Sequence, residues 1–334
     1  MIEAVERSRW SPALVYLGLM ALLVGAEGAL LTADGTWPDH IRLIHVMMPV
    51  YAVMTLPSVY YRNRLAVRAL DETRPLLGDD SSYEPLRFRL TVLPAGRTAL
   101  AALVGLALLG LLLLGRPDGA DRALGLYTSP TVSVLQWCFQ VVLWGGVGVT
   151  TYHLLRQSAA IHDAYTRYVR IDLFSPGPLY ALSRLAATNT LFTVAVGAVG
   201  AAAVAPGTRP GESLTTPEQW ALFMFVVLTV AGASFVLPLY GAHRLLAAEK
   251  SAALDAIGSR TKAVVAVLHS RVDAGSLTDA GDVQAALEGL AVSRTAVERI
   301  RTWPWEPDTA RAVVTGLVAP VVIYLVTRAV DAWF

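Results

Sequence analysis

Seven long apolar stretches divide this chain of 334 residues, and they constrain its fold more than any other feature. A helix needs roughly 20 apolar residues to cross the hydrocarbon core of a bilayer, and these stretches have about that length. They are Ser11–Leu31, Ile41–Tyr60, Thr98–Leu114, Thr131–Leu154, Leu185–Ala205, Gln219–Tyr240 and Ala312–Thr327. Only 16% of the residues are charged, whereas about 25% are charged in a typical soluble domain. The sequence therefore predicts an all-α polytopic membrane protein with seven transmembrane helices.

The basic residues predict how these helices are oriented. Of the 27 Lys and Arg residues, 22 lie in the segments on one side of the seven stretches. Lys and Arg are enriched in cytoplasmic segments because basic side chains resist translocation. The five on the other side are Arg42, Arg116, Arg122, Arg209 and Arg328. We expect a multi-pass protein of the cell (plasma) membrane with its N-terminus in the cytoplasm and its C-terminus outside.

The first stretch could also be compared with a signal peptide. Its flank, Met1–Trp10, carries two acidic and two basic side chains, so it lacks the net positive charge of such a peptide. Its apolar run is longer than the signal core of roughly 7–15 residues. We expect this stretch to be a retained helix.

The longest polar segment separates the last two apolar stretches and divides the chain into three parts. We expect transmembrane helices 1–6 in residues 1–242, a cytoplasmic helical hairpin in residues 243–306 and transmembrane helix 7 in residues 307–334. Apolar residues in the polar segment recur at helical spacing on two helices joined by a turn with Gly275 and Gly281. These two seams, which are candidates for subunit assembly, contain Leu254, Ile257, Val264 and Leu268, and then Val283, Leu287 and Leu290.

Few ionisable residues lie inside the apolar stretches, and such residues are functional candidates by default. Glu27 and His45 each lie about four residues from the outer end of a predicted helix, and the connection between the two helices is short. A contact between them, with Arg42 nearby, would form a proton- or cation-responsive site below the outer surface. The alternative is a structural pair that neutralises two partly buried groups.

The last apolar stretch carries a second set of candidates. Tyr324, Thr327 or Arg328, and Asp331 share one helical face, and Pro320 should kink the helix or loosen its backbone. If this helix lines a pore, the polar face forms a charged outer mouth. The alternative is an interfacial pair of Arg328 and Asp331, which are three residues apart and can bind each other.

Other polar and small residues in the stretches are typical of contacts between helices. We expect Gln136, Gln140, Asn189 and Ser234 to form hydrogen bonds between helices. Close helix contacts are expected at Gly145, Gly146, Gly148, Gly197, Gly200 and Gly232.

No motif in the sequence indicates an enzyme, a cofactor, a metal or a nucleic-acid partner. The six histidines have no HxxxH or HExxH spacing, and the single cysteine, Cys138, excludes a paired-cysteine zinc site. The nucleotide-binding glycine patterns and the nucleophile elbow are also absent. We therefore expect no catalytic site and no cofactor, and a lipid bilayer as the immediate partner.

Three segments resemble a group of uncharacterised prokaryotic polytopic membrane proteins. They are Ile171–Arg184 (IDLFSPGPLYALSR), Leu237–Lys250 (LPLYGAHRLLAAEK) and Thr302–Pro307 (TWPWEP), and with the hairpin they cover about a quarter of the chain. This resemblance implies a membrane location and no particular activity.

The layout is also similar to that of insect chemoreceptor-type ion channels, the odorant and gustatory receptors. These have seven helices, a cytoplasmic N-terminus, an extended sixth helix and a cytoplasmic helix before the last span. The resemblance implies a tetramer in which Val283, Leu287 and Leu290 anchor the subunits and Ala312–Thr327 lines the pore.

Three functions follow as hypotheses. The first is a homo-oligomeric ion channel whose last helix lines the pore. The second is a non-conducting scaffold or sensor whose hairpin docks a cytoplasmic partner. The third is a small-molecule transporter with a site near Glu27 and His45.

Overall fold

A computed structural model describes residues 11–35, 43–114, 129–169, 173, 177–203, 217–275 and 280–333. These residues form helices almost throughout, and the one strand-like feature among them is an isolated bridge between Leu77 and Val169. The long helices are α2 (Pro12–Ala33), α3 (Leu43–Thr73), α5 (Ala95–Leu114), α7 (Pro130–Asp163), α8 (Leu179–Ala203), α9 (Pro217–Asp273), α10 (Ala280–Arg299) and α11 (Pro307–Trp333). The shorter ones are η1 (Arg74–Leu76), η2 (Asp80–Ser82), α4 (Tyr83–Thr91) and the π-helical η3 (Ala164–Tyr168).

Six helical segments in the described part of the chain are long and apolar enough to cross a membrane. They are Pro12–Ala33, Asp80–Leu111, Pro130–Tyr168, Leu179–Ala201, Glu218–Asp273 and Pro307–Thr327. The predicted all-helical fold is thus confirmed, and six of the seven predicted spans overlap with segments that are long and apolar enough to cross a membrane. The remaining one, Ile41–Tyr60, lies mainly in α3, whose described side chains include His45, two internal prolines and Arg62. These residues lower the mean hydropathy of α3.

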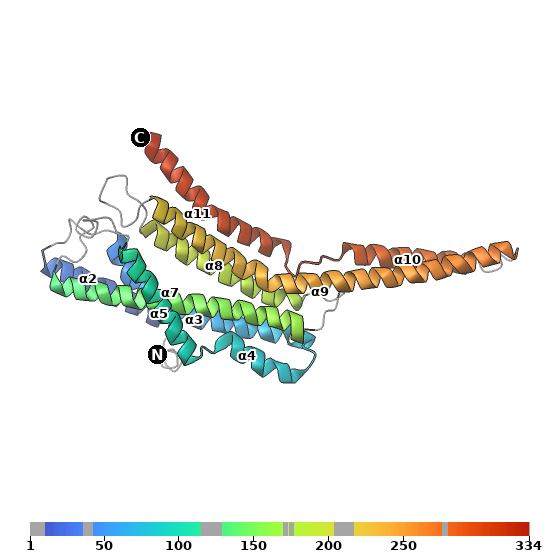
Figure 1. Cartoon of the computed structure of the whole chain (residues 1–334), viewed down its shortest axis with the longest axis horizontal. Coiled ribbons are helices and arrows are strands. Elements are labelled where there is room, and N and C mark those ends of the chain that lie inside the picture. The colour runs from blue at the N-terminus through green and yellow to red at the C-terminus, as the bar shows by residue number, and fades with distance from the viewer. Residues whose placement is uncertain are drawn as a thin grey trace.

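Helix α3 lies inside the bundle and is covered by other helices. It packs against α2, α7 and α8, while α5 packs on α7, and α11 packs mainly on α8 (Figure 1). The largest buried cluster joins the inner ends of α3, α4, α7, α8 and α9 and includes Leu70, Leu86, Tyr165 and Leu182, each at most 1% exposed. This core fixes the end of the bundle from which the hairpin extends.

Glycines allow α5 and α7 to cross with their backbones in contact. A Cβ on Gly105 would lie 2.0 Å from the carbonyl oxygen of Trp144, and one on Gly148 would lie 2.0 Å from that of Ala101. Two further glycines expected at helix contacts also leave no room for a side chain, because a Cβ on Gly146 would clash with Thr55 and one on Gly197 would clash with Val227.

The remaining predicted glycines, Gly145, Gly200 and Gly232, have only ordinary van der Waals space around them. Helix crossings in this bundle therefore depend on some of the expected small residues and not on others.

Helix α9 continues without a break from the bundle into the hairpin. Pro238 lies within it, and the helix ends at Asp273, followed by Gly275 with a φ of 68°. This left-handed conformation costs glycine little, so it permits the reversal into α10. The side-chain nitrogen of Lys250 donates to the carbonyls of Glu298 and Ile300, at 2.7 and 2.8 Å, and so caps the end of α10 on α9.

The two apolar seams of the hairpin face each other within one chain. Ile257 on α9 and Val283 on α10 are buried. The other seam residues, Leu254, Val264, Leu268, Leu287 and Leu290, are half-buried. The hairpin nevertheless exposes Val267, Val272 and Val292.

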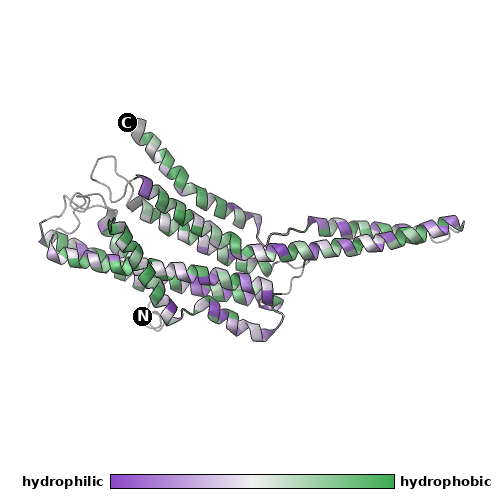
Figure 2. Cartoon of the chain, viewed as in Figure 1, coloured by the Kyte–Doolittle hydropathy of each residue, from purple (hydrophilic) through white to green (hydrophobic). Residues whose placement is uncertain are grey.

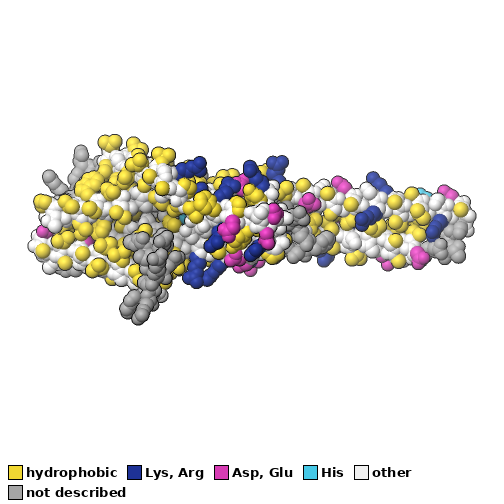
Figure 3. All heavy atoms as spheres, turned by 90° about the horizontal axis from the view of Figure 1, so that it is seen from below, with side chains coloured by type: hydrophobic (Ala, Val, Ile, Leu, Met, Phe, Trp, Pro, Cys, Tyr) yellow, Lys and Arg dark blue, Asp and Glu magenta, His cyan; other side chains and the backbone are white. Residues whose placement is uncertain are grey.

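Charge and hydropathy separate along the length of the molecule. Figure 2 shows the bundle mostly hydrophobic and the hairpin with mixed hydrophilic and hydrophobic residues. On the face drawn in Figure 3, Lys, Arg, Asp and Glu gather where the bundle meets the hairpin and along the hairpin. The opposite end of the bundle shows mainly hydrophobic side chains on this face.

Candidate functional site

Glu27, His45 and Gln136 form a buried polar cluster between α2, α3 and α7. The Nδ1 of His45 lies 3.2 Å from the Oε1 of Glu27. The Nε2 of Gln136 donates to the same Oε1 at 3.4 Å and lies 3.3 Å from His45 Nδ1. The three side chains are 1%, 3% and 0% exposed, so their charges and dipoles act with little screening by water.

Three helices position this cluster of Glu27, His45 and Gln136, which we call the outer cluster because it lies at the end of the bundle away from the hairpin. The short connection after α2 returns the chain into α3, so α2 and α3 pack side by side and bring Glu27 opposite His45. Gln136 enters from the first turns of α7, whose N-terminus is capped by the Ser129 hydroxyl. The contact between Glu27 and His45 was predicted; the participation of Gln136 was not, because no sequence pattern indicates which helix packs third. Arg42 lies outside the described residues.

The outer cluster leaves one acceptor for another group. Oε2 of Glu27 is buried and has no hydrogen-bond partner among the described residues. A buried carboxylate oxygen is costly unless a proton, an ion or water satisfies it. The cluster can therefore exchange a proton between carboxylate and imidazole, or hold a small cation at Glu27.

A second buried polar cluster lies nearer the hairpin, between α3, α7 and α8. The guanidinium of Arg62, in a residue 5% exposed, donates to the Thr193 hydroxyl at 3.2 Å and the Thr150 carbonyl at 3.5 Å, and it lies over the ring of Phe192. None of the described carboxylates forms an ion pair with Arg62. Among the described residues, its buried charge is stabilised by these two neutral hydrogen-bond acceptors and by the Phe192 ring.

The neighbouring side chains of this inner cluster are also incompletely paired. His153 is fully buried, and neither ring nitrogen has a hydrogen-bond partner among the described residues. Asn189 donates to Gln157 at 2.9 Å, and Gln157 donates to the Leu90 carbonyl at 3.0 Å, but the Oδ1 of Asn189 is unpartnered in the described part of the chain. Buried groups in this state usually contact water or an ion.

Sequence reasoning missed the inner cluster. Arg62 comes just after the predicted end of its span, so it read as a cytoplasmic residue. The available signal was the spacing of His153 and Gln157, which are four residues apart and so face the same way on a helix. Asn189 was correctly expected to form a hydrogen bond between helices.

Packed side chains separate the two clusters, which are roughly 25 Å apart along α3 at 1.5 Å per residue. Gln140 Nε2 contacts the Met48 sulfur at 3.9 Å and its Oε1 accepts from Trp144 at 3.1 Å. Thr55 fills the space beside Gly146.

Three candidate residues of the last helix, Pro320, Tyr324 and Thr327, have described side chains on α11. Tyr324 stacks on Trp220 of α9, with ring centroids 3.8 Å apart, so its ring is held between helices of the same chain. Thr327 is exposed and donates to the Ile323 carbonyl one turn back. Pro320 lies inside α11. The side chains of Arg328 and Asp331 lie outside the described set.

The turn between α10 and α11 is held by a stack of aromatic rings. Trp303 stacks on His243 and on Trp305, with centroids 4.1 and 4.2 Å apart, and Trp305 stacks on Phe235. Arg184 links this turn to the bundle by binding Glu306 at 3.4 Å and Glu72 at 2.5 Å. The start of α11 is therefore fixed, and Tyr324 still contacts α9, whereas the C-terminal end of α11 points away from the bundle in Figure 1.

Among the described residues, no group of three or more His, Cys, Asp or Glu side chains is arranged to hold a metal ion. Comparison of the chain with protein-family models, with curated proteins and with solved structures gives no match. The two buried polar clusters are the candidate functional sites among the described residues.

Proposed function

We propose that this chain is a transport protein of the cell membrane that moves a small ion through the bundle of α2, α3, α7 and α8, under control of the Glu27–His45 pair. The observation that carries the proposal is the 1% exposure of Glu27, with one carboxylate oxygen lacking a partner among the described residues. An ionisable group at membrane depth is expensive, and such groups mark ion pathways and proton relays.

The proposal places α3 across the membrane as a seventh span. Its surface faces α2, α7 and α8, so its polar residues are covered by protein and lipid need not solvate them. The N-terminus would lie in the cytoplasm, because the basic side chains gather at the hairpin end of the bundle. The hairpin would then be cytoplasmic and the C-terminus external.

The two clusters have opposite electrostatic character. Glu27 and His45 can each hold a proton, so the pair can take up a proton from the outer side and release it again, whereas the Arg62 guanidinium stays positively charged. Protonation of the outer cluster changes its interaction with Gln136 and with α7, and this change is the proposed control of passage. The uncompensated Arg62 favours an anion at the inner cluster and repels cations there.

The test is flux into liposomes that contain the purified protein, with separate dyes for protons, potassium and chloride. We expect a flux of at least one ion that depends on external pH, and loss of that pH dependence in Glu27→Gln. Asp308→Asn, an exposed carboxylate at the start of α11, is the matched control and should behave as wild type. Flux equal to that of empty liposomes for all three ions would refute the proposal.

A second candidate is a homo-oligomeric channel in which α11 lines a central pore. The observation in its favour is that only 6% of the most apolar part of α11 is buried, leaving Val314, Ile323 and Leu325 at least 60% exposed. Neighbouring subunits, a tetramer by the chemoreceptor resemblance, would cover this surface. Mass photometry in nanodiscs tests it, since a strictly monomeric particle leaves no central pore.

The scaffold hypothesis depends on the outer surface of the hairpin. The two seams pack against each other within the chain. A partner protein would therefore have to bind exposed residues of the hairpin such as Val267 and Val292. Partner capture that is lost in Val292→Asp, in a protein without ion flux, would favour this third function.

A further inference from the structure

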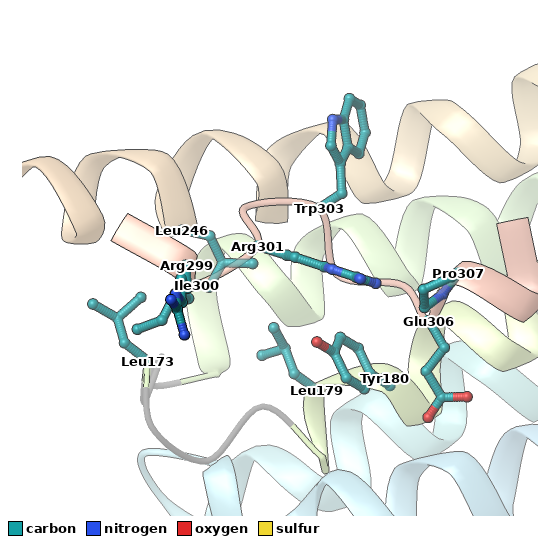
Figure 4. Close-up of a pocket in the computed structure, with 10 residues that line it drawn as sticks. All are labelled: Leu173, Leu179, Tyr180, Leu246, Arg299, Ile300, Arg301, Trp303, Glu306 and Pro307. Atoms are coloured by element: carbon teal, nitrogen blue, oxygen red, sulfur yellow. The ribbon is translucent and has the colours of Figure 1, made fainter. Parts of the chain in front are cut away.

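A cavity of about 360 Å³ lies at the junction of the bundle and the hairpin. It is open to the surface and is lined by the start of α8, by α9, by the end of α10 and by the turn that leads into α11. Figure 4 shows Arg299 beside Ile300 and Leu246 at one end of it, Arg301 extending toward Pro307 and Glu306 at the other, and Leu179 and Tyr180 between these ends. Cavities of this size are typical of small-ligand sites.

The charges around the cavity favour an anion. Neither the Arg299 nor the Arg301 guanidinium has a hydrogen bond or ion pair among the described residues. Among the described lining residues the carboxylate is that of Glu306, and Arg184 binds it at 3.4 Å, so its charge is offset. Lys250 covers the carbonyls at the end of α10 and reduces their repulsion of an anion.

The rest of the lining is apolar and aromatic. Leu173, Leu179, Leu246, Ile300 and Trp303 contribute carbon surface beside the two arginines. A free inorganic anion would gain nothing from this surface, whereas a phospholipid carries both a phosphate and acyl chains. Tryptophan is also enriched where membrane proteins meet the headgroup layer, and Trp303 and Trp305 lie in this turn.

We propose that this cavity, defined by Arg299, Arg301, Leu179 and Trp303, binds the phosphate headgroup of an anionic phospholipid. Basic pockets between helices on the cytoplasmic side are known to take such headgroups. The arginines bind the phosphate, and the apolar wall contacts the glycerol and the upper acyl carbons. This site lies at the other end of the bundle from Glu27 and does not depend on the proposed ion transport.

A bound lipid here would join three parts of the molecule. Arg299 and Arg301 belong to the end of the hairpin, Leu179 and Tyr180 begin α8, and Pro307 begins α11. A ligand that contacts all three restrains the angle between hairpin and bundle, and it adds to the contacts that already hold the start of α11.

The test uses the full chain in neutral detergent, titrated with phosphatidylglycerol or phosphatidylcholine, with bound lipid counted by native mass spectrometry. We expect wild type to retain phosphatidylglycerol preferentially. At about 1 kcal/mol for each basic residue, Arg299→Gln with Arg301→Gln should weaken this binding roughly thirtyfold. The matched control, Arg260→Gln with Lys262→Gln, removes the same charge from an exposed part of α9 and should not change it.

Further measurements distinguish a lipid phosphate from a free phosphate, and a lost binding site from a folding defect. Arg299→Lys with Arg301→Lys keeps the charge and should retain most of the binding, and circular dichroism should show unchanged helix content in every variant. Equal retention of the two lipids by wild type, or equal phosphatidylglycerol binding by wild type and the glutamine variant, would overturn the proposal. Displacement of phosphatidylglycerol by millimolar inorganic phosphate would assign the site to a free anion instead.

Discussion

His45 Nδ1 lies 3.2 Å from Glu27 Oε1, in a pair that is almost completely buried between α2 and α3. Two residues from different predicted spans thus contact each other, with Gln136 of α7 as a third member. This relationship gives the first prediction, because removing one partner of a buried pair costs more than removing both.

Glu27→Leu or His45→Leu alone should destabilise the bundle by about 3–5 kcal/mol, since each leaves the other group buried without its partner. The double variant should be less destabilised than the sum of the two, with a coupling energy of about 0.5–3 kcal/mol. Denaturation in mixed micelles measures the free energy of unfolding of the wild type, the two single variants and the double variant. Strict additivity would show that the two side chains do not interact.

Ala substitutions at the crossing of α5 and α7 should separate the two helices. Gly105→Ala and Gly148→Ala each place a methyl group against a carbonyl oxygen, and overpacking of this kind costs about 1–3 kcal/mol. Gly110→Ala, in the same helix with nothing within 4 Å, is the matched control. It should be neutral or stabilise by up to about 1 kcal/mol because alanine favours helix more than glycine does. Thermal denaturation of the three variants decides the matter, and equal effects at Gly105 and Gly110 would contradict the crossing.

Replacing His153 should distinguish structure from function. Neither of its ring nitrogens has a partner among the described residues, so His153→Leu should stabilise the protein by about 1–3 kcal/mol by removing an unsatisfied buried group. If the inner cluster serves ion passage, the same variant should lose flux in liposomes. A less stable protein would instead reveal that His153 binds water or another group that holds the bundle together.

The hairpin should respond to charge according to which side is changed. Ile257→Asp places a carboxylate between α9 and α10 at a residue 9% exposed, so the hairpin should open and become sensitive to limited proteolysis near Gly275. Val292→Asp lies on the outer surface at 70% exposure and should leave the cleavage rate unchanged. Protection of both variants would mean that the seams are not what joins the two helices.

The channel hypothesis makes a further prediction for Val292→Asp. If subunits assemble through the outer face of the hairpin, Val292→Asp should reduce the particle mass without opening the hairpin. Assembly that survives Val292→Asp would direct attention to α11 as the contact between subunits.

The sequence by itself determined the all-helical class of fold, six helices long and apolar enough to cross a membrane, and the position of the hairpin turn. Long apolar stretches must be helices of a membrane protein because backbone polar groups in lipid need partners within their own segment. Local signals also predicted that the chain would reverse near Gly275. These are properties of neighbouring residues, which a sequence shows directly.

Only the tertiary structure decided which helices meet. Gln136 joins Glu27 and His45, Arg62 lies buried beside His153, and Tyr324 stacks on Trp220 where a pore-facing side chain had been expected. The seams that were candidates for contacts between subunits are paired within one chain. Such contacts depend on the rotation and order of packed helices, and these follow from side-chain shape across long separations in sequence, which hydropathy and spacing do not encode.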